Sequence, residues 1–402
     1  MRSLASIAGV VGIGLALASQ ASAQGTGPVK IAVLNDQSSS FAIIGGTGAV
    51  EAAKMAIEDF GGSVLGKRVE LVSADHQNKP EVALTIAREW LEKDGVDVIV
   101  DIANSAIAVG VNNLLGDQKK LGLFVAPGIS RLVEEDCNGY GIAWAYDSPS
   151  MARVSALAQV RAGNKKYFIL SPDYTSGVIF ENTVRQVVTE NGGQVIGTVR
   201  APLGTTDFSS FLLQAQASGA EVLMLTLNGP ELINAVKQIQ EFGIERSMKI
   251  AAVAINDFEA KQAGVAALKG IQFMLPWSWT LDDSTRAFHK KLMQRSGFSA
   301  TWDHAGVYSA VSNYLKAVQA AGSKDPQAVL AKLREMPIQD MFAHNAKLLP
   351  TGRLIHDVYV LQIKAPDEVK EGWDVSKVVG TIPAAEAFPP LSESKCKLAK
   401  AG

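Results

Sequence analysis

The chain has 402 residues, and its 38 lysines and arginines against 40 aspartates and glutamates give a formal net charge of −2. No basic tract is long enough to neutralise a row of phosphates, which argues against nucleic acid as a partner. Beyond the N-terminal segment, no continuous apolar stretch approaches the length of about 18 residues that a membrane span needs. We therefore expect the mature chain to be soluble.

The N-terminus predicts a secretory signal peptide. Arg2 supplies a positive charge, residues 4–18 form an apolar run rich in glycine and alanine, and residues 21–23 read Ala-Ser-Ala, an A-x-A cleavage site. A membrane anchor is the alternative, but the run is short and glycine-rich for a hydrocarbon layer about 30 Å thick. No cysteine follows the run, so a lipid anchor is not expected. We expect residues 1–23 to be removed and the mature protein to reside in the bacterial periplasm.

About 380 residues remain, more than one hydrophobic core usually organises, so two domains are expected. From residue 29 onward, short β-branched runs alternate with longer runs of helical period, which is typical of parallel sheets with crossover helices. The first expected strands are 30–35, 68–74, 97–102 and 122–126, with helices at 46–60, 79–93 and 106–119. Turn chemistry at residues 147–150 then marks the expected crossing to the second domain.

A second set of elements follows the same order. Its expected strands are 166–171, 194–200, 222–227 and 249–254, with helices at 177–191, 208–218 and 230–241. A strand at 271–277, helices at 284–296, 302–321 and 327–335, and a strand at 358–363 precede a tail rich in proline and charge. A chain that crosses and returns in this way provides hinge segments that allow closure.

The expected lobes follow from these crossings. The N-terminal lobe comprises residues 28–147 plus 278–350, the C-terminal lobe comprises 148–277 plus 351–395, and residues 396–402 form a tail.

Two cysteines occur, Cys137 and Cys396, both in polar, loop-like sequence. In an exported protein such a pair is expected to form a disulfide, which would tie the tail to the first lobe. Two unrelated free thiols are the alternative. The cysteines lack C-x-x-C spacing and cannot form a thiolate zinc site unaided, and we expect neither a metal nor a cofactor.

Five segments, in order along the chain, resemble the leucine/isoleucine/valine-type periplasmic binding proteins of ABC transporters. They are residues 31–41 (IAVLNDQSSSF), 45–59 with its GG pair and the run AAKMAIED, 173–177 (DYTSG), 203–208 (LGTTDF) and 305–311 (AGVYSAV). The resemblance covers nearly the whole mature chain. It implies an α/β chain with the type I periplasmic binding protein fold, in which two Rossmann-like lobes with parallel sheets are joined by a three-crossover hinge. It also implies delivery of a ligand to a membrane permease.

In open parallel sheets, ligands bind at the carboxyl ends of strands, where loops lead into helices. Asn104 and Ser105 lie in such a loop, and the free N–H groups of a helix start suit a carboxylate; ordinary capping is the alternative. The resemblance places a carboxylate clamp there and a second clamp position at Gly128 and Ser130, which could also form a plain turn. Further candidates, Ser40 and Phe41, could instead belong to a solvated flexible loop.

The second lobe is expected to contribute Tyr174 and Asn228, which each follow a strand. Tyr174 can stack on a ligand and form a hydrogen bond with it, and a buried core tyrosine is the alternative. Trp277 lies beside the expected second crossover, where it either lines the cleft or packs under the hinge.

The ligand class depends on departures from the family pattern. The resemblance implies an acidic residue for a ligand ammonium group after the strand expected at 249–254, where only Asp257 is available. The tyrosine common near Gly45 is replaced by Ile44. A buried ammonium without a carboxylate partner costs several kcal/mol. We therefore expect a small carboxylate without an α-amino group, with an aromatic acid first and a branched-chain amino acid or amide second.

Catalysis is not expected. The five histidines lack H-x-x-x-H and H-E-x-x-H spacing, and neither a G-x-S-x-G elbow nor a Walker loop occurs. A periplasmic sensor that reports its ligand to a membrane regulator is a further alternative, because it uses the same closure as transport. We expect a monomer.

Overall fold

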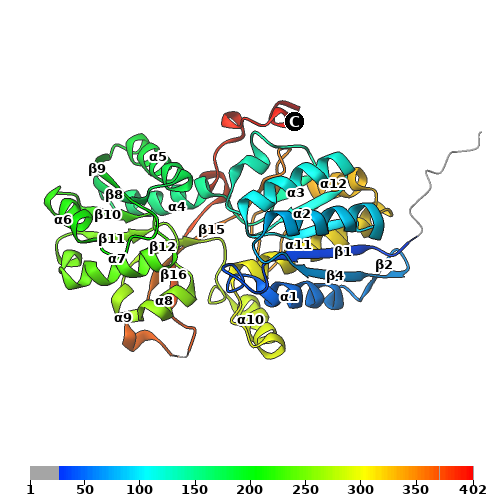
Figure 1. Cartoon of the computed structure of the whole chain (residues 1–402), viewed down its shortest axis with the longest axis horizontal. Helices are drawn as coiled ribbons and strands as arrows, with labels where there is room; N and C mark the ends of the chain where they lie inside the picture. Colours follow the sequence, from blue (N-terminus) through cyan, green and yellow to red (C-terminus); the bar gives the residue numbers. More distant parts are fainter. Residues whose placement is uncertain (1–26, 371, 402) are drawn as a thin grey trace, which may run out of the picture.

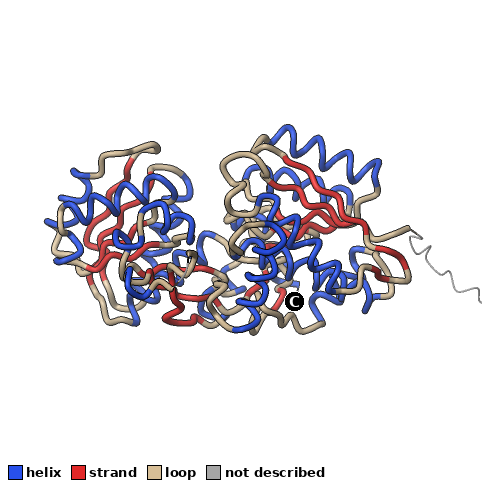
Figure 2. Tube along the Cα trace, turned by 90° about the horizontal axis from the view of Figure 1, so that it is seen from below, coloured by secondary structure: helices blue, strands red, loops and turns tan. Residues whose placement is uncertain are grey.

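The computed structural model describes residues 27–370 and 372–401. They form two α/β bodies along the long axis of the molecule, each with strands in its interior and helices outside (Figures 1 and 2). No helix in this part of the chain is long and apolar enough to cross a membrane. The signal peptide expected at residues 1–23 lies outside the described residues.

The first sheet has the strand order β4-β1-β5-β6-β7, and all of its paired strands are parallel. Its strands are β1 (Lys30–Asn35), β4 (Glu70–Asp75), β5 (Val98–Asp101), β6 (Leu121–Phe124) and β7 (Gly141–Ala143). Ile31 and Val33 of β1 pack into one hydrophobic cluster, whereas Ala32 and Leu34 pack into another. Burial on both faces explains why β1 has a continuous apolar run.

Helices cover both faces of this sheet (Figure 1). One face carries α1 (Gly46–Asp59), α10 (Asp283–Ser296) and α11 (Trp302–Ala321), and the other carries α2 (Pro80–Glu89) and α3 (Ser105–Gln118). Helix α12 (Pro326–Glu335) packs against α11. The chain thus returns to the first body after building most of the second.

The second sheet has the order β16-β15-β12-β11-β10-β8-β9. The parallel strands are β8 (Lys166–Pro172), β9 (Gln194–Ala201), β10 (Val222–Leu225), β11 (Lys249–Ala252) and β12 (Gln272–Leu275). β15 (Val358–Ile363) is antiparallel to both β12 and β16 (Ser376–Ile382). No strand is predicted from the sequence after residue 363, but that segment contributes the edge strand β16.

Helices also cover both faces of the second sheet. Helices α4 (Ser148–Arg161) and α5 (Thr175–Glu190) lie on one face. Helices α6 (Ser209–Ala217), α7 (Gly229–Glu241) and α8 (Asp257–Ala263) lie on the other. The short elements are β2 (Ser63–Val64), β3 (Lys67–Arg68), β13 (Lys347–Leu348), β14 (Leu354–Ile355), α9 (Val265–Leu268) and α13 (Ala384–Ala387).

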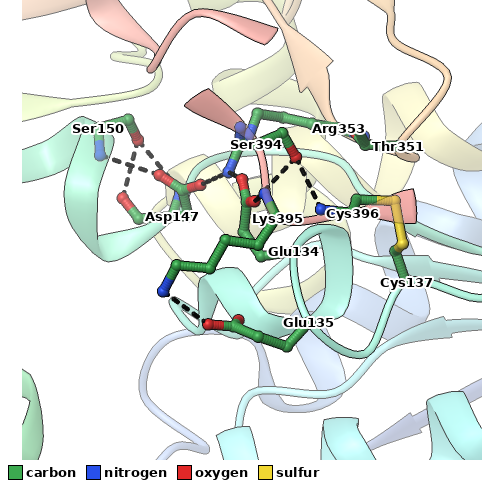
Figure 3. A network of polar contacts seen from close by, with 10 residues as sticks. All are labelled: Glu134, Glu135, Cys137, Asp147, Ser150, Thr351, Arg353, Ser394, Lys395 and Cys396. Atoms are coloured by element: carbon green, nitrogen blue, oxygen red, sulfur yellow. Dashed lines mark hydrogen bonds and ion pairs between the residues drawn. A yellow bond between two sulfur atoms is a disulfide. The ribbon is translucent and has the colours of Figure 1, made fainter. Parts of the chain in front are cut away.

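The chain passes between the bodies after β7, after β12 and before β15. A buried ion-pair network joins two of these crossovers (Figure 3). Arg353, whose side chain is 3% exposed, lies 2.8 Å from carboxylate oxygens of both Glu134 and Asp147. Asp147 also caps α4 by accepting a hydrogen bond from Ser150 N at 2.9 Å.

The predicted disulfide between Cys137 and Cys396 is confirmed. It fixes the tail to the loop before β7, where Ser394 Oγ and Lys395 N donate hydrogen bonds to Glu134 at 2.8 and 2.7 Å (Figure 3). Residues 394–396 therefore lie against the first body, although β16 belongs to the second sheet. The tail forms a fourth connection between the bodies.

Candidate ligand-binding site

The first-lobe candidates follow three neighbouring strands. β1, β5 and β6 lie side by side in one parallel sheet, so the loops after them meet at its carboxyl edge. These loops carry Ser40 and Phe41, Asn104 and Ser105, and Gly128 and Ser130. The fold thus brings all six residues to the edge where α/β proteins bind ligands.

Asn104 acts as the N-cap of α3. Its Oδ1 accepts hydrogen bonds from Ala106 N and Ile107 N at 2.8 and 3.1 Å, and its Nδ2 donates to Asn78 Oδ1 at 2.7 Å. Both polar atoms of the Asn104 side chain thus form hydrogen bonds within the protein. This supports the alternative in which Asn104 only caps the helix.

Ser105 and Ser130 differ from Asn104 in having free hydroxyls. Both are half-buried, Ser105 as the first residue of α3 and Ser130 as the first of a 3₁₀ turn (Ser130–Val133). Among residues 27–370 and 372–401, neither hydroxyl has a hydrogen-bond partner. Two free hydroxyls at the ends of adjacent strands are suited to the two oxygens of a carboxylate.

The backbone of Gly128 connects the loop after β6 to the first crossover. Its carbonyl oxygen accepts hydrogen bonds from Ser148 N at 2.7 Å and Ser148 Oγ at 2.8 Å. A Cβ at position 128 would lie 3.1 Å from Ser148 Oγ and 3.2 Å from the ring of Tyr146. The loop can approach the crossover this closely because residue 128 has no side chain.

The loop that carries Ser40 and Phe41 is organised by the buried Asp36. Asp36 accepts hydrogen bonds from Ser38 N, Phe41 N, and the amide and hydroxyl of Ser39, at 2.6–3.3 Å. Burial acts to raise the pKa of Asp36, but these hydrogen bonds together lower it below its usual value. Ser40 is exposed and Phe41 half-buried, so both remain candidates for ligand contact.

The second-lobe candidates also follow neighbouring parallel strands. Tyr174 follows β8, Asn228 follows β10, and Asp257 begins α8 after β11. Tyr174 is 39% exposed, which excludes the buried-core alternative for it. Asn228 is also exposed.

Glu259, which was not among the predicted site residues, joins two of these loops. Glu259 is buried; its Oε1 accepts from Gly229 N at 2.8 Å, and its Oε2 accepts from Asn256 N and Nδ2 at 2.7 and 3.0 Å. The spacing of Asn256 and Glu259 is that of a capping box and could have revealed this role.

A solvent-open pocket with a volume of about 90 Å³ is lined by residues of both bodies. Ile43 and residues 298–302 come from the first body, and residues 256–258 come from the second. Of the predicted ligand residues, Asp257 and Trp277 line it. Its wall is rich in aromatic side chains, namely Phe258, Trp277, Trp279, Phe298, Trp302 and Trp373.

Asp257 and Trp277 both bind other parts of the protein. Asp257 accepts from Trp279 Nε1 and Ser376 Oγ, each at 3.3 Å, and burial raises its pKa to about 6. Trp277 is 1% exposed and donates from Nε1 to the carbonyl of Met341 at 2.9 Å. Its ring also packs edge-on against Phe288, so most of Trp277 supports the hinge.

Trp302, which was expected only as a helix start, contacts both bodies. Its Nε1 donates to Asn256 Oδ1 at 3.0 Å, across from the first body to the second. Its ring packs edge-on against Tyr146, with centroids 4.9 Å apart, and Tyr146 Oη donates to Ala126 O at 2.9 Å. These contacts run from the end of β11 to the loop of Gly128.

Two α/β bodies linked by three crossovers define the type I periplasmic binding protein fold. Residues 28–369 match the periplasmic binding protein family, and the chain belongs to that family. It is a substrate-binding component of an ABC transporter, a class of transport protein that binds a small molecule in the periplasm and delivers it to a membrane permease.

Individual relatives differ in the ligands that their descriptions name. A branched-chain amino acid ABC transporter ligand-binding protein from Burkholderia xenovorans LB400 is 43% identical, with a TM-score of 0.91 over 92% of this chain and 100% of that chain. Leu/Ile/Val-binding protein homolog 6 from Brucella melitensis is 26% identical over 75% of this chain and 78% of its own length. A solute-binding protein from R. palustris in complex with 4-hydroxybenzoate shares the fold, with 22% identity and a TM-score of 0.75 over 89% of this chain and 98% of that chain.

Proposed function

We propose that this binding protein closes on a small carboxylic acid without an α-amino group, with an aromatic acid as the preferred class. The observation that carries this proposal is the pair of free hydroxyls at Ser105 and Ser130, which follow adjacent strands. Hydrogen bonds to a charged group contribute about 1.5–3 kcal/mol each, so two hydroxyls can fix the position of a carboxylate. The lobes would close about the crossovers near residues 147, 277 and 350.

The ring of such a ligand has suitable partners. Tyr174 is exposed at the carboxyl edge of the second sheet, and aromatic side chains line the cavity near Asp257. Aromatic rings contribute about 0.5–1.5 kcal/mol to a ring–ring contact beyond the burial of area. The R. palustris protein supports this reading only as an example of the same fold with an aromatic acid bound.

The acidic side chains of the second lobe favour a ligand without an ammonium group. Glu259 uses both of its oxygens to bind loop amides, and Asp257 accepts hydrogen bonds from Trp279 and Ser376. Burial raises the pKa of Asp257 to about 6, so its charge is lost as the pH falls through that value. A branched-chain amino acid is the second candidate, favoured by the 43% identity to the Burkholderia protein.

Thermal unfolding with candidate ligands tests the proposal. Benzoate and 4-hydroxybenzoate at about 100 times Kd should stabilise the protein by about 2.7 kcal/mol, whereas L-leucine and L-valine should leave Tm unchanged. Stabilisation by the amino acids alone would reject the proposed ligand class. At the same ligand concentration, Ser105→Ala should remove about half or more of the stabilisation by aromatic acids.

Asp257→Asn is the matched variant for the second candidate. It should leave the binding of an aromatic acid largely intact, because that ligand carries no ammonium group to pair with the carboxylate. If the ligand is an amino acid, the same substitution removes the ammonium partner and binding is lost. Transport and sensing are separated by measuring uptake of labelled ligand in a strain that lacks this protein. Uptake is lost if the protein is needed for transport and stays unchanged if the protein is only a sensor.

A further inference from the structure

The two residues that lead from β5 into the loop of Ser105 have an unusual backbone. Asp101 has φ 82° and Ile102 has φ 70°, both in the left-handed region. This region is uncommon for residues with a Cβ, and a β-branched residue there is a genuine outlier. Such conformations persist only where surrounding contacts hold them, and they cluster at binding sites.

Contacts to the side chain of Asp101 provide this hold. Asp101 is 1% exposed, and its Oδ2 accepts from Asn35 Nδ2 at 3.0 Å. The carboxyl group of Asp303, in the first turn of α11 and 0% exposed, lies next to that of Asp101. Within the described part of the chain, both oxygens of Asp303 and the Oδ1 of Asp101 are buried without a hydrogen-bond donor as partner. Both carboxyl groups lie under Gly45, where a Cβ would overlap Asp303 Oδ2 and lie 3.2 Å from Asp101 Oδ2.

Two ionised carboxylates can only accept hydrogen bonds, so a hydrogen bond between Asp101 and Asp303 requires a proton on one of them. Among the described residues, neither carboxyl receives an ion pair from a lysine or arginine. Burial raises the pKa of Asp101 to about 6, and burial together with the charge of Asp101 raises the pKa of Asp303 well above its usual range. Two adjacent carboxyl groups without a cation hold one proton between them near neutral pH.

The other titratable groups nearby are neutral. His304 Nδ1 accepts from Thr301 N at 3.1 Å, which leaves Nε2 to donate to Gly45 O at 2.8 Å, and burial lowers its pKa to about 4. Tyr146 faces Asp303 from the first crossover, and burial raises the pKa of its phenol. The proton between the two aspartates therefore has no competing cation.

We propose that Asp303 is a positioning residue of the ligand site: a proton shared with Asp101 holds Asp101 and Ile102 in the left-handed conformation that places Ser105. The role deepens the proposed function, because it matters for ligand binding only if Ser105 contacts the ligand. Asp303 itself touches no ligand. Asp303 lies on α11 and acts on Ser105 through Asp101 and Ile102 at the end of β5.

Amide hydrogen exchange and ligand binding test this role in the full mature chain. Asp303→Ala removes the bridge, so exchange at Ala106 N and Ile107 N should accelerate at least tenfold, and Kd for benzoate should rise at least tenfold. Asp303→Asn can still donate to Asp101 and should keep both quantities within about threefold of wild type. Asp97→Asn is the control for loss of a buried acid, since Asp97 pairs with Lys120 and Lys324.

A second substitution, Asp101→Gly, tests whether Asp303→Ala weakens binding by changing the backbone at Asp101 or only by destabilising the protein. Glycine adopts positive φ without strain, so Asp101→Gly in the Asp303→Ala protein should restore at least half of the lost free energy of benzoate binding. A variant that is merely destabilised would not recover, because Asp101→Gly adds no contact. Unchanged exchange in Asp303→Ala, or the absence of rescue, would overturn the proposal.

The pH profile is a second readout. Benzoate stays ionised between pH 6 and pH 9, whereas the carboxyl pair loses its proton as pH rises through its raised pKa values. Because Asp257 titrates near pH 6 as well, the series is measured in Asp257→Asn protein. There, Kd should rise more than tenfold across this range, and adding Asp303→Asn should reduce the change to within twofold; equal profiles would contradict the shared proton.

The outcomes distinguish the two proposals. If the wild-type protein binds L-leucine and not benzoate, the proposed ligand class fails, and the same series is run with L-leucine. If neither binds, amide exchange still decides whether Asp303 holds the strand end.

Discussion

A side chain that binds a ligand needs a polar atom or an exposed face that the folded chain does not already use. Ser105, Ser130 and Tyr174 meet this condition. The side-chain amide of Asn104 already caps α3. Trp277 is buried, and its indole N–H donates a hydrogen bond to the carbonyl oxygen of Met341. We therefore expect the first three residues to contribute most of the binding free energy.

Replacement of Tyr174 by alanine should weaken binding without unfolding the protein. Loss of a ring that stacks on the ligand costs about 1–3 kcal/mol of binding free energy, whereas an exposed side chain contributes little to the core. Titration calorimetry with benzoate and circular dichroism melts measure the two effects. Tyr174→Phe keeps the ring and shows what the hydroxyl adds. An unfolded Tyr174→Ala protein would contradict the exposed position of this side chain.

Ser105, Ser130 and Tyr174 could be predicted from the sequence because each lies in a loop that follows a recognisable strand. Asp303 could not be predicted in this way, because its partner Asp101 is about 200 residues earlier and no local pattern links the two. Trp302 was missed for the same reason, since its partners Asn256 and Tyr146 come from other segments. Tertiary contacts of this kind depend on how distant segments pack in the folded chain, and the spacing of residues along the sequence does not predict that packing.

Among the elements, those with a strong hydrophobic period were predictable. The bounds of β1, α11 and β15 agree with the expected residues. β16 was missed because Lys377 and Gly380 interrupt its apolar residues, as is common in edge strands. The helix expected at 79–93 is instead α2 followed by a π turn (Trp90–Asp94).

Buried ion pairs stabilise the crossovers between the two bodies, in addition to the covalent chain. Arg353 joins Glu134, after β6, to Asp147, which caps α4 at the first crossover (Figure 3). Burial acts to lower the pKa of Arg353, but the two carboxylates outweigh it and raise the value. This network fixes where α4 begins relative to the first sheet.

Arg353→Met should destabilise the protein strongly. It leaves the carboxylates of Glu134 and Asp147 without their cation, and breaking a buried ion pair costs about 3–5 kcal/mol. Urea denaturation measures the free energy of unfolding. Adding Glu134→Gln and Asp147→Asn removes the uncompensated charges and should restore much of the loss.

Lys395→Met provides a control within the same network. Lys395 binds Glu135 in an exposed ion pair, which contributes little because solvent screens it. Its substitution should leave Tm nearly unchanged. If Arg353→Met is equally mild, the buried network does not stabilise the crossover.

In the molecule as a whole, the tail adds a connection that the three crossovers do not provide. The chain leaves the second sheet after β16 and is anchored on the first body by the disulfide at Cys137 (Figures 1 and 3). The bodies of a binding protein open and close about their hinge. A covalent strap beside the hinge should limit how far they open.

Replacing both cysteines by serine should therefore affect stability and opening together. The disulfide closes a loop with a sequence separation of 259 residues, and its loss should lower the free energy of unfolding by about 2–4 kcal/mol. Small-angle scattering without ligand should give a larger radius of gyration than for the oxidised wild type. Kd should rise by less than tenfold, because wider opening lowers the population of the closed state without changing the site. Wild-type protein treated with reductant should behave like the double variant, and an unchanged radius in both would show that the strap does not restrict opening.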